Sequence, residues 1–151
     1  MDVVKSFRAD IKELDNVLAF VKEEISSYVS NKLLFKINIA IEELFVNIAS
    51  YAYEKNEEND DNNLVDISIN VDLENKNIVI TFVDSGAKFN PISKEDPCID
   101  LPAEERKVGG LGIYIVKKTV DKIDYKYIDN KNVLTIEKSY EKGEEKKWNH
   151  L

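Results

Sequence analysis

The longest periodic pattern in the chain is an apolar stripe between residues 37 and 52. Its hydrophobic side chains recur at steps of three and four, the spacing of one helix face: Ile37, Ile41, Leu44, Ile48 and Ala52. The stripe predicts a helix from about Lys32 to Tyr53. Beside it, Glu43 and Asn47 stand one turn apart, so their side chains point the same way.

Shorter patterns predict the other elements. Residues 2–8 suggest a first strand, and residues 14–29 a helix that Asp10 and Glu13 would open as a capping box. Ser30 and Asn31 break that helix and cap the next one. Alternating hydrophobic residues predict four more strands, and a helical pattern follows three glycines: strands at 64–73, 77–83, 123–127 and 132–140, and a helix at about 113–122.

No period survives between residues 85 and 108, a segment with three prolines and Gly86. A loop this long within a compact domain is typical of lids and binding segments. The order of elements predicts an α+β fold, a two-layer α/β sandwich in which three helices cover one face of a mainly antiparallel mixed sheet. We expect the functional site between the helix layer and this lid.

Composition narrows the class of protein. A chain of 151 residues is long enough for one core, so we expect one domain over residues 1–142 and a charged tail at 143–151. The net charge of −8 argues against direct nucleic-acid binding and is compatible with a basic protein partner. The single cysteine, Cys98, excludes an internal disulfide. With no signal peptide and no long apolar run, the sequence favours a cytoplasmic location and no membrane span.

Three polar clusters carry the candidate chemistry, and each has a plain structural interpretation. Glu43 and Asn47 could simply flank the core stripe. The step from Asp84 to Gly86 could be a turn that ends a strand, and the run 109–112, GGLG, could be a loop whose glycines let a helix start. Each signal is weak alone. Their order and spacing together point to a function.

Taken together, the clusters resemble the nucleotide-binding boxes of the GHKL ATPase superfamily, and more closely those of the small bacterial anti-sigma factor serine/threonine kinases. The E-x-x-x-N box corresponds to Glu43 and Asn47, and the D-x-G box to Asp84 and Gly86 within DSGAKFNP. The G-x-G helix start is similar to GGLGIYIVKK. The resemblance extends from about residue 3 to 139 and implies the Bergerat ATP-binding fold with a lid loop.

The resemblance implies ATP and Mg²⁺ as cofactors, and the residue types suit them. Asp84 at a strand end would accept the adenine amino group, and Gly86 would let the base approach the backbone. The Asn47 side chain would hold magnesium against the phosphates, since this ion takes few protein oxygens. Glu43, one turn earlier, would act as general base on the incoming hydroxyl.

Further residues are assigned to the nucleotide by the same resemblance. Free N–H groups at a glycine-rich helix start suit phosphates. Val108 stands where some relatives carry a basic residue, for which a neighbouring cation could substitute. The lysine after the D-x-G box could reach a phosphate or face water. The residues assigned on these grounds, with one threonine of the final hairpin, are Lys88, Arg106, Lys107, Gly109, Gly110, Leu111, Gly112 and Thr135.

The family also implies the partners. Such a kinase phosphorylates a serine or threonine of an anti-anti-sigma partner and is usually a homodimer. It binds and silences a sigma factor when the unphosphorylated form of that partner is scarce. Two alternatives remain open: an ATP-binding module that sequesters a regulator without catalysis, and a detached histidine-kinase-like catalytic domain. An acid-stable phosphoserine would separate the kinase from the histidine-directed alternative.

Overall fold

The computed structural model describes residues 2–53, 62–93 and 111–140. Within these ranges the chain forms strands, three α-helices and two 3₁₀ turns in the following order: β1 (Asp2–Arg8), η1 (Ile11–Glu13), α1 (Leu14–Ile25), α2 (Asn31–Tyr51), β2 (Leu64–Asp72), β3 (Asn77–Asp84), η2 (Pro91–Ser93), α3 (Leu111–Thr119), β4 (Lys122–Ile128) and β5 (Lys131–Ser139). The predicted order of elements is confirmed.

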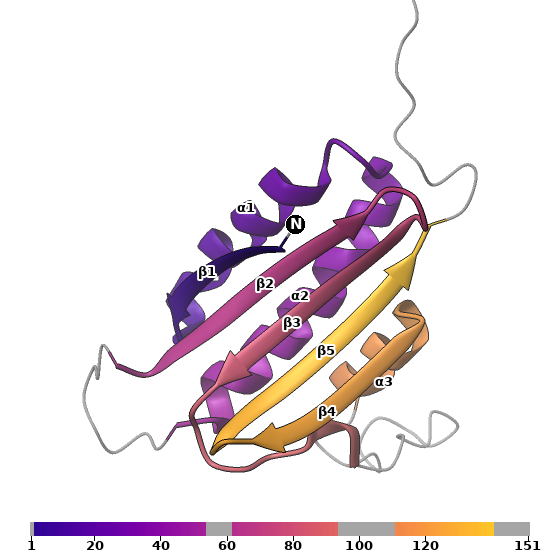
Figure 1. The fold of residues 1–151 in the computed structure, drawn as a ribbon. Coiled ribbons are helices and arrows are strands. Elements are labelled where there is room, and N and C mark those ends of the chain that lie inside the picture. Colours follow the sequence, from indigo (N-terminus) through magenta and orange to yellow (C-terminus); the bar gives the residue numbers. More distant parts are fainter. Residues whose placement is uncertain (1, 54–61, 94–110, 141–151) are drawn as a thin grey trace, which may run out of the picture.

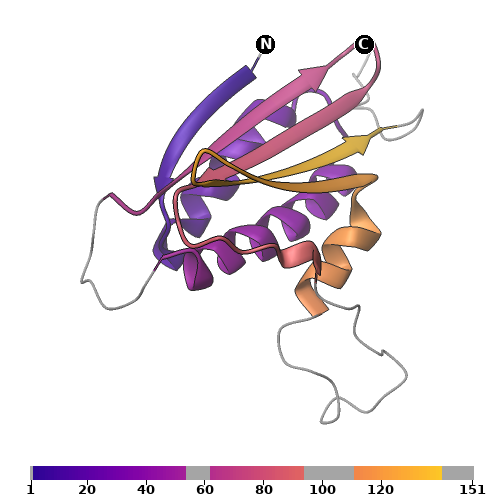
Figure 2. The same cartoon turned by 60° about the horizontal axis from the view of Figure 1, so that its bottom comes forward.

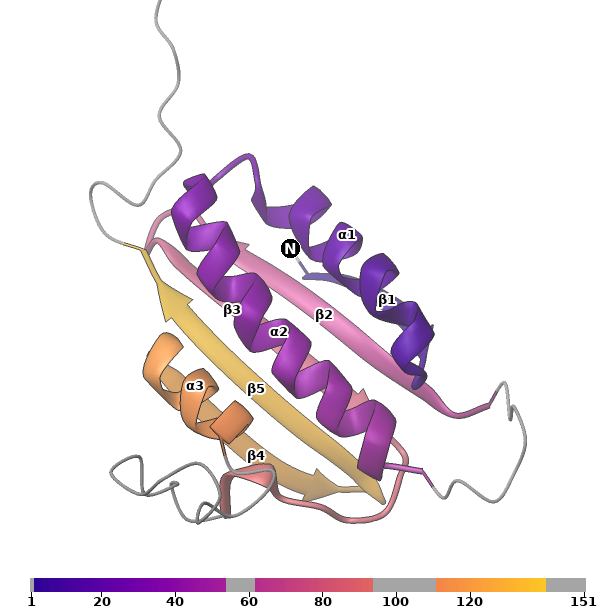
Figure 3. The same ribbon diagram turned by 180° about the vertical axis from the view of Figure 1, so that it is seen from behind.

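The strands form one sheet in the order β1-β2-β3-β5-β4, and every neighbouring pair is antiparallel (Figure 1). All three helices lie on the same side of this sheet (Figure 2). Seen from behind, α2 crosses the middle of the sheet between α1 and α3 (Figure 3). The predicted α+β sandwich, with three helices on one face, is therefore confirmed.

Strict alternation along the central strands builds the core. The inward positions of β3 are buried, from Ile78 through Ile80 to Phe82, whereas their neighbours are only half-buried. From the helix layer, Leu44 and Phe45 of α2 pack against them with no exposed surface. Burial of each such side chain contributes about 1.5–3 kcal/mol. This shared core fixes α2 against the sheet, and α2 carries two of the predicted site residues.

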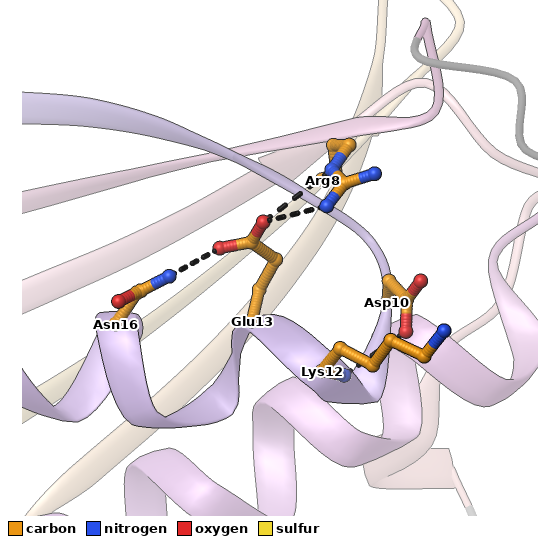
Figure 4. Close-up of polar contacts among 5 residues, drawn as sticks. All are labelled: Arg8, Asp10, Lys12, Glu13 and Asn16. Atoms are coloured by element: carbon orange, nitrogen blue, oxygen red, sulfur yellow. Dashed lines mark hydrogen bonds and ion pairs between the residues drawn. The ribbon is translucent and has the colours of Figure 1, made fainter.

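The junction between β1 and α1 differs from the predicted capping box (Figure 4). The Asp10 carboxylate accepts a hydrogen bond from the Lys12 amide at 2.9 Å and so caps η1. The Asp10 amide already donates to the Arg8 carbonyl, so Glu13 does not bond back to it. Instead, Glu13 accepts from Asn16 at 2.8 Å and from Arg8 at 3.1 Å, and these bonds lower its pKa. The capping-box prediction was wrong because a 3₁₀ turn precedes the helix.

The turns that follow mostly agree with the sequence. Ser30 caps α2 by accepting a hydrogen bond from the Leu33 amide at 3.2 Å, as predicted. Helix α1 ends at Ile25, earlier than expected, while Val29 stays buried in the connection. Asp129 and Asn130 both adopt positive φ, which gives the β4–β5 hairpin a two-residue turn of the type that matches strand twist.

Among the described residues, no helix has both the length and the apolar composition that a bilayer span requires.

Candidate functional site

A pocket lies between the C-terminal half of α2 and the neighbouring ends of β3, β4 and β5, which meet at the lower left of Figure 1. The space within its lining, including the part open to solvent, is about 380 Å³. The segment after β3 forms one wall. The lining residues are Leu44, Asn47, Ile48, Ala52, Asp84, Phe89, Pro91, Tyr125, Asn132 and Leu134. The structure thus brings two predicted site residues, Asn47 and Asp84, to one pocket.

Asp84 is the charged group at the bottom of this pocket. It occupies the last inward position of β3, after Phe82, and only 5% of its surface is exposed. Its Oδ1 accepts hydrogen bonds from the Gly86 amide and from Asn132 Nδ2, each at 2.9 Å. Burial raises the pKa of this carboxyl, and the two hydrogen bonds partly oppose the rise. Both bonds go to Oδ1, and among the described residues no donor contacts Oδ2.

The turn after Asp84 is docked against the end of α2, and only glycine fits at its second position. A Cβ at Gly86 would lie 2.0 Å from the main-chain oxygen of Ala52. The adjacent Ala87 amide donates to that same oxygen at 2.8 Å. This contact requires the glycine of the D-x-G box for packing as well as for any approach of a base.

Tyr53 ties the turn to the start of β2. Its hydroxyl donates to the Leu64 carbonyl at 2.5 Å and accepts from the Ser85 amide at 3.0 Å. Partial burial raises the pKa of this phenol, so it stays protonated and can hold both bonds. No sequence pattern predicted this bridging role of Tyr53.

Asn132 was not predicted as a site residue. It lies directly opposite Asp84 in the pairing of β3 with β5 and is equally buried. A signal was present in the sequence, because Asn132 interrupts the inward-facing hydrophobic series that continues with Leu134 and Ile136. A polar side chain at a core position of a strand calls for a hydrogen-bonding partner.

The pocket walls are mostly apolar. Phe89 and Tyr125 face it from the segment after β3 and from β4, with Leu44, Ile48 and Leu134 completing the lining. The ring of Phe89 also contacts the ring of Tyr51, with centroids 5.9 Å apart. An apolar slot with a few placed polar groups, ending in a buried carboxylate, suits a planar base that carries an amino group.

Glu43 and Asn47 lie on α2, closer to its start than the end that the Gly86 turn contacts. Both side chains are half-buried, and Asn47 lines the pocket. Helix α3 begins beside Glu43, since a Cβ at Gly112 would lie 2.2 Å from Glu43 Oε2. In the direction from the end of α2 toward its start, the site therefore presents four features in order: Asp84, Asn47, Glu43 and the start of α3. A ligand with its base at Asp84 and a charged tail would run toward the positive end of α3.

The remaining assigned residues are not all brought to this pocket. Lys88 is exposed, with Nζ 5.5 Å from the centroid of the Tyr127 ring, and does not line the pocket. Thr135 points to the sheet face away from the helices, where its hydroxyl lies 3.4 Å from that of Thr81. The alternation that turns Asn132 inward turns Thr135 outward, so the structure does not place it in the site.

Four assigned residues lie outside the described part of the chain: Arg106, Lys107, Gly109 and Gly110. Leu111 is described only as the first residue of α3. The described residues also contain no group of three or more histidine, cysteine, aspartate or glutamate side chains that could hold a metal ion. Magnesium keeps most of its waters, so a single pocket-lining amide such as Asn47 still fits its ligand preference.

A two-layer sandwich with a buried aspartate at the end of its third strand and an E-x-x-x-N helix packed on the sheet has the features of a histidine kinase-like ATPase. The model of the histidine kinase-like ATPase domain family matches residues 7–138, so the chain belongs to this family. The predicted GHKL membership is confirmed. A search of curated proteins found no match.

The fold is similar to that of the RsbU and RsbW domains of Rv1364c from Mycobacterium tuberculosis, with a TM-score of 0.62 at 12% sequence identity. The match covers 92% of this chain and 32% of the other. At this identity the likeness shows a common fold. The present chain spans about a third of that longer chain.

Proposed function

We propose that this chain is an ATP- and Mg²⁺-dependent serine/threonine protein kinase of the anti-sigma type. It phosphorylates an anti-anti-sigma partner and sequesters a sigma factor, as a cytoplasmic homodimer with no direct contact to nucleic acid or membrane. The observation that carries the nucleotide part is Asp84, which is buried in an aromatic-walled pocket with one oxygen held and the other open. The anti-sigma assignment rests on the resemblance of the DSGAKFNP segment and the final hairpin.

Each site residue has a separate role in this proposal. The second oxygen of Asp84 accepts a hydrogen bond from the amino group of the base. Phe89 and Tyr125 enclose the base. Asn47 would hold the magnesium ion through its amide oxygen, and the amides at the start of α3 would bind the phosphates. Bound ATP would supply the phosphoryl group and leave as ADP, with the metal neutralising the phosphate charge. Glu43, half-buried beside α3, takes the proton from the acceptor hydroxyl.

Calorimetric titration with ATP and GTP, with and without magnesium, tests the nucleotide site. Selective, magnesium-dependent ATP binding is expected, and Asp84→Asn should abolish the selectivity because the amide presents both a donor and an acceptor. Asp124→Asn is the matched control, since this aspartate lies exposed on β4. Equal ATP binding by the wild type and Asp84→Asn would contradict the assignment of the pocket.

Transfer is tested separately from binding. Glu43→Ala should abolish phosphoryl transfer to a candidate partner and spare ATP binding, whereas Asn47→Ala should weaken the magnesium-dependent part of binding. Glu42→Ala, an exposed neighbour on the same helix, is the control. Full kinase activity in Glu43→Ala would show that the base is another group. An acid-labile product would indicate transfer to histidine instead of serine or threonine.

One observation favours a second candidate, an ATP-binding module that sequesters a regulator without catalysis. Lys88, the cation nearest the D-x-G turn in sequence, rests over the Tyr127 ring and does not line the pocket. ATP binding with no phosphorylated product, together with capture of a sigma factor, would establish this candidate.

A further inference from the structure

Asn132 and Asp84 are the two buried polar residues in the part of the chain that the structure describes. They face each other across the β3–β5 pair, each with 5% of its surface exposed. Leaving a buried polar group without partners costs about 1–3 kcal/mol. An amide at this inward position is therefore stable only through the hydrogen bonds it makes.

The Asn132 side chain uses its whole hydrogen-bonding capacity within the protein. Nδ2 donates to Asp84 Oδ1 and to the Ala87 carbonyl, both at 2.9 Å. Oδ1 accepts from the Phe89 amide at 3.1 Å and from the Tyr125 hydroxyl. A carboxamide has two N–H donors and an oxygen that accepts two bonds. No donor remains for a ligand, so any effect of Asn132 on binding is exerted through the groups it holds.

We propose that Asn132 is a positioning residue that sets base selectivity by holding the Asp84 carboxylate in the orientation that turns its second oxygen toward the ligand. This inference rests on the proposed ATP site. Gly86 and Asn132 both donate to Oδ1, so rotation of the carboxylate would break both bonds. Oδ2 is then kept as a pure acceptor. An amino group on the base can donate to it, whereas a carbonyl at the same position would set two acceptors against each other.

The same amide holds the wall of the pocket. Its bonds to the Ala87 carbonyl and the Phe89 amide fasten the segment after β3 to β5. Phe89 lines the pocket beside Tyr125, whose hydroxyl is also bound by this amide. The Asn132 side chain thus orients the Asp84 carboxylate that would accept from the base, and it also positions the aromatic residues that would enclose the base.

The test compares ATP with ITP. The base of ITP carries a carbonyl at the position where adenine carries the amino group that would donate to Asp84. Calorimetric affinities for both nucleotides are measured with magnesium for the wild type, Asn132→Ala and Thr135→Ala. The wild type should prefer ATP, and Asn132→Ala should reduce the ratio of the two affinities by about tenfold or more, since a bond to a charged group is lost. Thr135→Ala changes the outward face of the same strand and should keep the wild-type ratio.

Asn132→Asp provides a pH profile that a purely structural role would not produce. With one proton shared between the facing carboxylates, the new side chain can still donate to Asp84. Loss of that proton leaves two opposed anions that no longer hold each other in place, so the preference for ATP over ITP should fall as pH rises. The phenols of Tyr53 and Tyr125, whose pKa values are raised, stay neutral up to about pH 9, and Lys88 is engaged over Tyr127.

The outcomes separate this inference from the proposed function. A wild type that prefers ATP, with a folded Asn132→Ala that keeps the full preference, would overturn the inference and leave the ATP site standing. Failure of the wild type to bind either nucleotide would overturn both. If Asn132→Ala does not fold, Asn132→Asp decides the question: ATP preference equal to that of the wild type at every pH would overturn the role of Asn132.

Discussion

At the scale of single residues, Asp84 is the proposed acceptor for the base, and its burial also destabilises the folded chain when the carboxyl is ionised. The carboxylate that a base would need as acceptor is the same group that burial places in a poorly solvated pocket. Its two hydrogen bonds recover part of the lost hydration. Burial nevertheless dominates, so the pKa of Asp84 is raised above the ordinary value of 3.8.

This raised pKa predicts two opposite pH dependences. Because the folded chain takes up the Asp84 proton at higher pH than the unfolded chain, the contribution of Asp84 to stability falls as pH rises from 3.8 through the raised value. ATP binding needs the anion and should instead be lost as pH falls through the raised pKa. Carbon-13 NMR titration of the Asp84 carboxyl, assigned with Asp84→Asn, measures it directly. A midpoint at or below 3.8 would contradict the prediction.

Residues that act through a motif could be predicted from the sequence, whereas Asn132 offered only a break in a hydrophobic series. Asp84 and Gly86 stand in a short pattern at the end of a strand. The importance of Asn132 depends on the pairing of β3 with β5, which places it opposite Asp84 although 48 positions separate them. Thr135 was assigned to the site without considering the alternation of its strand, which turns it outward.

At the scale of elements, two glycines let other parts of the chain approach α2, but they meet different kinds of atom. Gly86 faces the main-chain oxygen of Ala52, which cannot move without disturbing the helix end. Gly112 faces the carboxylate of Glu43, the far end of a flexible side chain. The same added methyl group should therefore have different consequences at the two positions.

We predict that Gly112→Ala folds with a stability within about 1 kcal/mol of the wild type, because Glu43 can swing aside and alanine suits a helix better than glycine. Phosphoryl transfer should fall sharply, since the proposed base is displaced. Gly86→Ala serves as the contrast and should cost about 3 kcal/mol or more. Urea denaturation and a transfer assay measure the two effects. Full transfer by Gly112→Ala would contradict the placement of Glu43 as base.

Most elements could be predicted because their hydrophobic periods reflect a one-sided core. Strand β2 alternates cleanly and β3 less cleanly, and the predicted bounds of β2, β3 and β5 agree with the structure within two residues. The end of α1 could not be predicted in the same way. Val29 is buried although it lies beyond the helix, so it continues the apolar pattern without continuing the helical backbone.

At the scale of the whole molecule, the pocket and the core share one helix. Leu44 and Ile48 line the pocket and also belong to the buried cluster between the helices and the sheet. Phe45, on the same helix, is fully buried and does not line the pocket. A ligand that fills the pocket should therefore stabilise the core as a unit.

We predict that Phe45→Ala lowers the free energy of unfolding by about 3–5 kcal/mol through the cavity it leaves. Magnesium and ATP at about a hundred times the dissociation constant should restore about 2.7 kcal/mol by mass action. Phe35→Ala is the control, since this residue of α2 is 67% exposed. Urea titrations with and without nucleotide measure both effects. Similar costs for the two variants, or no shift with ATP, would contradict this coupling.

The strand order also constrains when the site can exist during synthesis. Because β5 lies between β3 and β4, the chain must place its last described strand into the interior of the sheet. During synthesis Asp84 is made before Asn132, its partner across the β3–β5 pair, so this pair cannot form until β5 has been made. The nascent chain consequently has no formed pocket for a nucleotide. At the proposed site, a nucleotide would therefore bind only after the final hairpin has joined the sheet, so it could stabilise the completed fold but not its early intermediates.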